Sequence, residues 1–309
     1  MENELKPPII LFGNTRSGTT IVQDVVCARP GIVSWYEPSE LWLYADPARP
    51  HDEFDAQDAT ERVKRYIRGR FLQYQQLHGG DRVFEKTPKN IFKIPYVHSI
   101  FPEASYLYIV RSPFSFISSV EMKWQKTVTK QGILRRLKST PLSQLHYHLY
   151  NYLVQQWNKR ILKRKYLSVW GPRYKGIQED VKNLDLLTVI ARQWAYGSRK
   201  AEQDLARLGP GRVLKLRYED FVDDPLPHLE RISAHCGVEM TSEITTAAKE
   251  MVKADRKLKW QRFQPADLAR ILPEIEGEMD RHGYTIPEEI QEAIAKLPDR
   301  QSQLATSTG

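Results

Sequence analysis

The sequence predicts an α/β fold in which a central parallel sheet is flanked by helices. Short apolar stretches that suit buried strands alternate with segments of helical periodicity, which is the pattern of parallel sheets. The first strand runs into a glycine-containing loop and then a helix, an arrangement that presents backbone N–H groups to an anion. We expect one domain over residues 1–300 of the 309-residue chain, followed by a disordered tail at 301–309.

Five segments are expected to form the strands of the sheet. They are PPIILFG at 7–13, GIVSWYEP at 31–38, DRVFEKTP at 81–88, SYLYIV at 105–110 and RVLKLRY at 212–218. A Pro-Gly turn precedes the second segment, and Gly209–Pro210–Gly211 sets off the last. The order of strands and helices therefore favours a doubly wound sheet.

Helices are expected between these strands. They cover residues 19–28, 56–77 and a region near 90–100, with further helices starting at Ser112–Pro113 and after Pro225. Residues 126–180 do not keep the alternation and are rich in tryptophan, tyrosine and basic side chains. We predict that they form a helical insertion on the side where the second substrate binds.

Composition limits the functional classes. A net charge of +8, concentrated in the middle third of the chain, favours an anionic ligand. No apolar run approaches the roughly 20 residues that span a bilayer, and the N-terminus lacks a secretory signal, so a cytoplasmic protein is expected. Cys27 and Cys236 are expected to be free thiols, and the eight histidines show no metal-ligand spacing, so no metal site is predicted.

The loop GNTRSGTT at 13–20 resembles a nucleotide phosphate loop without its lysine. Gly13 and Gly18 stand at the spacing of G-x-x-x-x-G-K-[ST], but Thr19 occupies the lysine position and Arg16 lies inside the loop. An NTPase uses that lysine on the β- and γ-phosphates, and a carboxylate to hold magnesium. Here the strand SYLYIV ends in Arg111 instead of an aspartate. The loop is therefore predicted to bind an anion without magnesium.

Further motifs follow the loop in a set order. They are EKTP at 85–88, YIVRSPFSFISS at 108–119, RYEDFVDDP at 217–225, KW at 259–260 and HGY at 282–284. With this ordered set the chain resembles the sulfotransferases that use 3′-phosphoadenosine 5′-phosphosulfate (PAPS). It is more similar to the carbohydrate and tyrosylprotein branches, and to bacterial enzymes like them, than to the cytosolic phenol branch.

The resemblance implies a P-loop-like sulfotransferase fold, PAPS as donor and 3′,5′-adenosine bisphosphate (PAP) as product. It assigns the 5′-phosphosulfate to the loop and the 3′-phosphate to the pair Arg111 and Ser119, with Tyr218 near the nucleotide. A late-loop lysine, Lys259 or alternatively Lys257, would close over the phosphates. The implied loop contacts are Arg16, Ser17, Gly18, Thr19 and Thr20.

The resemblance also implies catalytic roles. Lys86 and Arg16 would stabilise the charge that develops on the leaving oxygen. The cytosolic branch uses a histidine base two residues after the matching lysine, but this chain has Pro88 there, which cannot take a proton. A carboxylate general base is therefore expected, either Glu37 or Glu40, while Glu85 could be a structural partner of Lys86 or Arg16.

The leading hypothesis is in-line transfer of a sulfuryl group to a hydroxyl of a carbohydrate or small metabolite. The basic middle region fits an anionic or saccharide acceptor, and no nucleic-acid partner is expected. Two alternatives stay open: a P-loop nucleoside or nucleotide kinase with a displaced lysine, and a non-catalytic nucleotide- or nucleic-acid-binding module. The sequence carries no signal for an oligomeric state.

Overall fold

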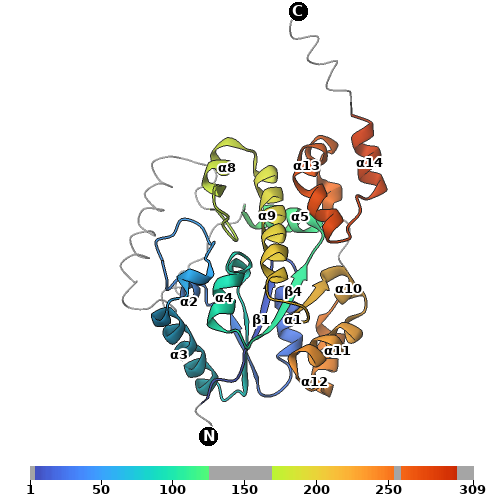
Figure 1. Cartoon of the computed structure of the whole chain (residues 1–309). Coiled ribbons are helices and arrows are strands. Elements are labelled where there is room, and N and C mark those ends of the chain that lie inside the picture. The colour runs from blue at the N-terminus through green and yellow to red at the C-terminus, as the bar shows by residue number, and fades with distance from the viewer. Residues whose placement is uncertain (1–3, 125–168, 254–258, 298–309) are drawn as a thin grey trace, which may run out of the picture.

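A computed structural model describes residues 4–124, 169–253 and 259–297 of the chain (Figure 1). Most of the predicted helical insertion, residues 125–168, and the predicted tail at 301–309 lie outside the described residues. The five predicted strands form one parallel sheet in the order β2-β3-β1-β4-β5. The predicted fold class is confirmed.

The strands are short, and the three inner strands are better buried than the edge strands β2 and β5. Their bounds are β1 Ile9–Gly13, β2 Ile32–Tyr36, β3 Arg82–Lys86, β4 Ser105–Val110 and β5 Val213–Arg217. Every residue of β1, at the centre of the sheet, is buried. This explains why IILFG is a continuous apolar run, since both faces of a parallel sheet are covered by helices.

Successive side chains of each strand point to opposite faces, and two hydrophobic cores result. On one face Ile9 and Leu11 of β1 pack with four helices. These are α1 Thr19–Val26, α10 Tyr218–Asp223, α11 Pro225–Cys236 and α12 Ser242–Met251.

On the other face Ile10 and Phe12 pack with the larger set of helices. Figure 1 shows α3, α4, α9 and α13 on this side. The set comprises α3 Glu61–Leu77, α4 Ile94–Ile100, α5 Pro113–Trp124, α8 Ile177–Asn183, α9 Leu186–Ala206, α13 Pro265–Arg281 and α14 Glu288–Ala295. Trp42, Phe71 and Phe101 form an aromatic cluster in this core.

Two predicted helices are each divided. Residues 56–77 form a 3-10 turn, η1 Ala56–Asp58, and then α3, because Thr60 caps α3 by accepting from the Val63 amide. Residues 90–100 divide into η2 Pro88–Phe92 and α4, which has a proline in its first turn. The described part of the 126–180 insertion is a loop up to Gly176 and the start of α8.

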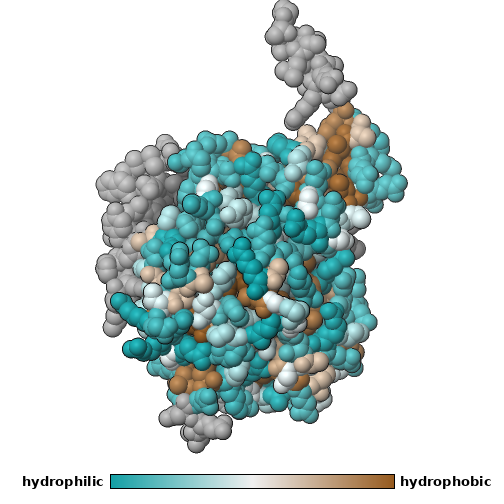
Figure 2. Space-filling view, viewed as in Figure 1, coloured by the Kyte–Doolittle hydropathy of each residue, from teal (hydrophilic) through white to brown (hydrophobic). Residues whose placement is uncertain are grey.

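The face in Figure 2 is largely hydrophilic, with apolar side chains gathered where α14 meets α13. No helix within the described ranges is long and apolar enough to cross a membrane. Cys27 and Cys236 are both free thiols. The part of the molecule that positions ligand-binding side chains is the edge where the strands end.

Candidate active site

The predicted site residues gather at the carboxyl ends of the strands, where ligands bind in open parallel sheets. The phosphate loop follows β1, and Glu37 follows β2. Lys86 is the last residue of β3, Arg111 follows β4 and Tyr218 follows β5. Residues separated by up to 200 positions in the chain thus line one edge of the sheet.

Gly18 is the turning point of the phosphate loop. It caps α1 with a φ of 86°, a left-handed backbone that favours glycine. A Cβ atom there would lie 2.1 Å from Cδ2 of Tyr218, so the tyrosine ring packs directly on the glycine. The first backbone N–H groups of α1, which have no carbonyl partner within the helix, lie at this turn together with the positive end of the helix dipole.

Arg16 links the loop to Arg111, which follows β4, and to Ser119, which lies within α5. Its backbone is also left-handed, with a φ of 63°. Its Nε donates to Oγ of Ser119 over 2.9 Å, and its carbonyl oxygen accepts from a terminal guanidinium nitrogen of Arg111 over 2.8 Å. Arg111 and Ser119 therefore do converge, with Arg16 between them.

Two further segments lie beside Arg16, Arg111 and Ser119 or beside the helix that carries Ser119. They are the residue after β5, Tyr218, and the segment after α12. The Arg111 guanidinium lies 4.3 Å from the centre of the Tyr218 ring, a cation–π contact. Lys259 begins η4 (Lys259–Arg262), but its side chain lies outside the described part, as does all of Lys257. Arg262 in η4 donates to the Ser118 carbonyl oxygen over 3.0 Å, which holds this segment beside α5.

Lys86 and Glu37 form an ion pair at the loop. The Lys86 ammonium is buried and donates to Oε1 of Glu37 over 2.7 Å and to Oγ1 of Thr20 over 3.0 Å. Glu37 has a φ of 46°, and its amide donates to the Lys86 carbonyl oxygen over 3.1 Å. The end of β3, the end of β2 and the start of α1 are thus tied together at one ammonium group.

The two candidate base residues have different surroundings. The side chain of Glu37 is 38% exposed and in contact with Lys86. Glu40, in the short helix α2 Ser39–Trp42, is buried, and its charge acts on the ammonium of Lys93. Glu37 therefore reaches the phosphate loop through Lys86, which also donates to Thr20.

Glu85 does not pair with Lys86 or Arg16, which corrects that expectation. Neighbouring residues of a strand point to opposite faces, so Glu85 faces the larger core while Lys86 faces the loop. Trp42 and Thr87 donate to its Oε1 over 2.9 Å and 2.5 Å, and the Asn90 amide lies 3.4 Å from its Oε2. Burial raises the pKa of Glu85 to about 7, although the bonds from Thr87 and Trp42 favour the charged form.

A buried carboxylate with three cationic neighbours lies near the start of η2, and sequence reasoning did not find it. Asp52 lies 3.1 Å from a guanidinium nitrogen of Arg173, 3.8 Å from Nζ of Lys89 and 4.0 Å from Nζ of Lys93. Burial alone would raise the pKa of Asp52, but these three cations hold it well below its usual value. The cluster fixes the chain where it returns from the insertion, since the Asp52 amide also donates to the Arg173 carbonyl oxygen and the Arg173 amide donates to Oδ2 of Asp52.

The returning segment also lies against the phosphate loop. A Cβ atom on Gly171 would lie 3.4 Å from Cγ2 of Thr15. Gln193 of α9 donates to the carbonyl oxygens of Trp170 and Pro172, each over 3.0 Å. Residues 170–172, in the described part of the insertion, are therefore held beside the loop. Over residues 4–124, 169–253 and 259–297, no group of three or more histidine, cysteine or acidic side chains is arranged to hold a metal ion.

Comparison with known proteins gives one family. The sequence profile of the sulfotransferase family matches residues 7–177 and 164–242, which is more than half of the chain. The nodulation protein NoeE of Sinorhizobium fredii is 27% identical over 145 residues, covering 40% of this chain and 34% of that protein. The omega-hydroxy-beta-dihydromenaquinone-9 sulfotransferase Stf3 of Mycobacterium tuberculosis is 22% identical over 257 residues, covering 80% of this chain and 54% of that protein. The chain thus spans about half or less of the length of these curated relatives.

Solved structures show the same fold at low sequence identity. Sulfotransferase STF9 from Mycobacterium avium has a TM-score of 0.52 at 15% identity, covering 92% of this chain and 78% of that one. The sulfotransferase domain from the curacin biosynthetic pathway has a TM-score of 0.50 at 15% identity, covering 92% of this chain and 100% of that one. Fold and profile agree with the family that the motifs predicted.

The pKa of Glu85 yields a test of this geometry. Because its folded-state pKa, about 7, lies above the usual 4.5, Glu85 stabilises the fold fully below pH 4.5, and this contribution is lost as the pH rises through 7. We expect the unfolding free energy to fall by about 2–3 kcal/mol relative to Glu85→Gln between pH 5 and pH 8. Chemical denaturation across that pH range measures it. Glu239 is exposed, so the unfolding free energy of Glu239→Gln should change with pH as that of the unmodified protein does. The same pH dependence in Glu85→Gln would contradict the prediction.

Proposed function

The chain belongs to the sulfotransferase family, and from this premise we propose that it transfers the sulfuryl group of PAPS, the donor of that family, to a hydroxyl. The observation that carries the proposal is the position of the Lys86–Glu37 pair. A buried cation and a partly exposed carboxylate are bonded to each other here, and the cation also donates to Thr20 of the phosphate loop. This arrangement joins an anion-binding loop to a charge-stabilising group and a proton acceptor.

The loop fits the phosphosulfate end of the donor. Ser17 is fully buried, and its hydroxyl oxygen has no hydrogen-bond partner among the residues that the structure describes. A buried polar atom in this state calls for a ligand or water. Gly18 and Thr19 would supply backbone N–H groups, Ser17, Thr19 and Thr20 hydroxyl groups, and Arg16 a guanidinium group suited to an oxyanion. The Ser17 amide itself donates to the Asn14 carbonyl oxygen over 3.2 Å.

The second anionic group of the donor would lie by Arg111. Arg111 and Ser119 are the proposed ligands of the 3′-phosphate, with Arg16 joining them to the loop. The Tyr218 ring, packed between Gly18 and Arg111, would border the nucleotide. Lys259 remains the proposed late-loop contact, since η4 is held beside α5 by Arg262.

Lys86 is the proposed stabiliser of the leaving oxygen. Its ammonium has three N–H donors, of which Glu37 and Thr20 take two, so one is left for an oxygen in the loop. Bound PAPS supplies the activated sulfuryl group. As the bond from the acceptor oxygen to sulfur forms, the bond from sulfur to the phosphate oxygen breaks. The negative charge then appears on the oxygen that Lys86 faces.

Glu37 is the proposed general base. It would accept the proton of the acceptor hydroxyl, which balances the charge that leaves with the bisphosphate. Glu40 is the weaker candidate, because its side chain is buried, whereas Glu37 is partly exposed and paired with Lys86. Pro88, two residues after Lys86, supplies no alternative proton acceptor.

The acceptor is proposed to be a hydroxyl-bearing saccharide or small metabolite. It would approach from the side of the insertion, because the returning segment at Gly171 lies against the loop residue Thr15. The relative Stf3 is an omega-hydroxy-beta-dihydromenaquinone-9 sulfotransferase, and its acceptor is one example of a small hydroxyl-bearing molecule.

Donor binding should not depend on magnesium. We expect 3′,5′-adenosine bisphosphate to raise the melting temperature in the presence of EDTA, by about 2.7 kcal/mol of added stability at 100 times its Kd. Differential scanning fluorimetry with the bisphosphate, ATP and ATP with magnesium measures this. Arg111→Ala should weaken the response, whereas Arg70→Ala, an exposed arginine on α3, should leave it unchanged. A response to magnesium-ATP alone would contradict the proposal and favour a kinase.

Removing the proposed base should separate turnover from binding. Glu37→Gln keeps an oxygen for the Lys86 bond but cannot take a proton, so kcat should fall by about 10²- to 10⁴-fold while bisphosphate affinity is kept. Steady-state kinetics and calorimetric binding report the two quantities. Glu40→Gln is the matched control and should keep most of its turnover. The base would be reassigned if Glu37→Gln turned over normally and Glu40→Gln did not.

A further inference from the structure

The order of the strands shows on which side of Lys86 an acceptor would lie, if the proposed function is taken as the starting point. The strands run β2-β3-β1-β4-β5, and the proposed donor contacts follow β1, β4 and β5. Lys86 ends β3, and Glu37 follows β2. In an in-line displacement the incoming and the leaving oxygen lie on opposite sides of the transferred group. Because the donor takes the side from β1 to β5, the acceptor would lie on the β2 side, next to Glu37.

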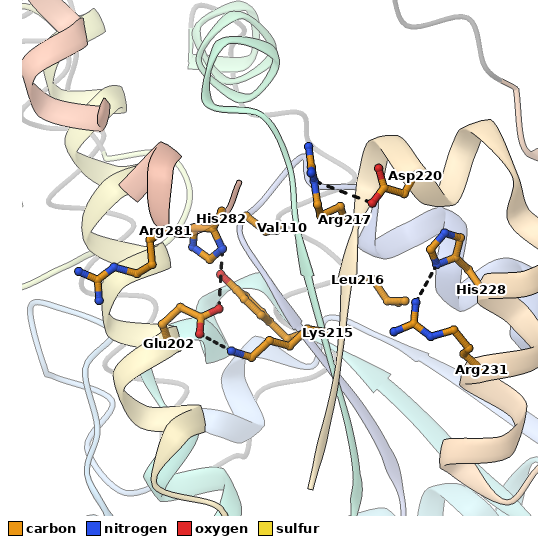
Figure 3. Close-up of a pocket in the computed structure, with 11 residues that line it drawn as sticks. Val110, Glu202, Lys215, Leu216, Arg217, Asp220, His228, Arg231, Arg281 and His282 are labelled. Atoms are coloured by element: carbon orange, nitrogen blue, oxygen red, sulfur yellow. Dashed lines mark hydrogen bonds and ion pairs between the residues drawn. The ribbon is translucent and has the colours of Figure 1, made fainter. Parts of the chain in front are cut away.

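The cavity at the opposite edge of the sheet does not suit this acceptor (Figure 3). It has a volume of about 320 Å³ and is lined by residues of β4 and β5, so β1 and β3 separate it from β2. Charged groups of its wall pair with one another: Lys215 with Glu202, and Arg217 with Asp220 over 3.9 Å. Acceptor-binding side chains are therefore expected at the end of β2.

Tyr36, the last residue of β2, presents an aromatic ring at that place. It is 45% exposed, and among the four exposed large hydrophobic residues of the described ranges it is the aromatic one. It lies opposite Lys86 in the register of β2 and β3, and the centre of its ring is 5.8 Å from the Lys86 Nζ. The ring therefore borders the proposed reaction centre, while a large part of it stays open to solvent.

Asp24 of α1 holds this ring in place. The Tyr36 hydroxyl donates to Oδ1 of Asp24. The neighbouring Gln23 donates to the carbonyl oxygens of Trp35 and Phe84, over 3.4 Å and 2.9 Å. Helix α1 is thus bonded to the ends of β2 and β3. Since a carboxylate has about four lone-pair sites, Asp24 keeps acceptor capacity for a hydroxyl group of a ligand.

We propose that Tyr36 binds the acceptor, and that this acceptor is a neutral saccharide whose ring lies against the tyrosine ring. A sugar ring has an apolar C–H face and hydroxyl groups at its edge, so it fits an aromatic surface beside a carboxylate. The charged groups bonded to Tyr36 or to Lys86 are two carboxylates, those of Asp24 and Glu37. Together with the single ammonium they leave a net negative charge, so a carboxylate or sulfate on the sugar would be repelled.

The test uses the protein saturated with 3′,5′-adenosine bisphosphate, which occupies the proposed donor site. Methyl β-D-glucopyranoside, methyl β-D-galactopyranoside, methyl β-D-glucuronide and sorbitol are titrated, and saturation-transfer difference NMR measures their binding. We expect at least one neutral glycoside to bind more tightly than the anionic glucuronide and the open-chain sorbitol. Equal or tighter binding of the glucuronide or of sorbitol, or no binding of either neutral glycoside, would overturn the proposal.

Variants at Tyr36 assign the binding to its ring. Tyr36→Ala should raise the Kd of the bound glycoside about tenfold, which corresponds to about 1.4 kcal/mol. Tyr36→Phe keeps the ring but loses the bond to Asp24, so its Kd should stay within about threefold. Leu77→Ala, at a residue of α3 that is 78% exposed, is the matched control and should change nothing. An unchanged Kd in Tyr36→Ala, or an equal loss in Tyr36→Phe, would contradict the role of the ring.

Donor binding separates this inference from the proposed function. All three variants should keep the bisphosphate affinity of the unmodified protein, because neither Tyr36 nor Leu77 is a proposed donor contact. If the unmodified protein does not bind the bisphosphate, the proposed function fails. If it binds the bisphosphate but neither neutral glycoside, only the assignment of Tyr36 to a saccharide acceptor fails.

Discussion

The ion pair between Lys86 and Glu37 is the interaction around which the proposed active site is built. The Lys86 ammonium is almost wholly buried, and a buried charge is tolerated only when it is paired and hydrogen-bonded. Its partners Glu37 and Thr20 come from the end of β2 and the start of α1. Removing either charge would leave the other uncompensated beside the loop, so this pair constrains three elements together.

Strain in the backbone points to the same place. Apart from glycines, Arg16 and Glu37 are the two residues with positive φ in the described chain, at 63° and 46°. Such conformations cost about 1–3 kcal/mol each and persist where the surroundings hold them. Ser119 and Arg111 hold Arg16, and Lys86 holds Glu37 through both its side chain and its carbonyl oxygen. The proposed anion ligand and the proposed base are thus fixed before any substrate binds.

Much of the fold and the central part of the site could be predicted from the sequence, because both rest on local signals. Short apolar runs identify the strands, and parallel strands bring their carboxyl ends to one edge whatever separates them in the chain. The family resemblance assigned Lys86, Arg111 and Tyr218 to the site, and the parallel sheet explains why they lie at the same edge as Gly18. Arg16 and Ser119 also meet at this edge, but the spacing of the two residues in the sequence could not show which atoms form their hydrogen bond.

Other features depend on tertiary contacts that leave no local pattern. The cluster at Asp52 takes its cations from two separate segments, residues 89–93 and the loop that contains Arg173. Glu85 was placed with Lys86 because the two are adjacent in sequence, whereas the strand sends them to opposite faces. The proposal of Glu37 over Glu40 likewise rests on the contact of Glu37 with Lys86, which sequence spacing does not show.

The most direct measurement of the central claim is transfer of labelled sulfate from PAPS in the presence of EDTA. The acceptor panel would cover sugars, phenols, tyrosine peptides and lipid alcohols. The account predicts a labelled sulfate ester of at least one hydroxyl acceptor and an equal amount of 3′,5′-adenosine bisphosphate. Release of the bisphosphate with inorganic sulfate alone across the whole panel, or no consumption of PAPS while magnesium-ATP is consumed, would contradict it.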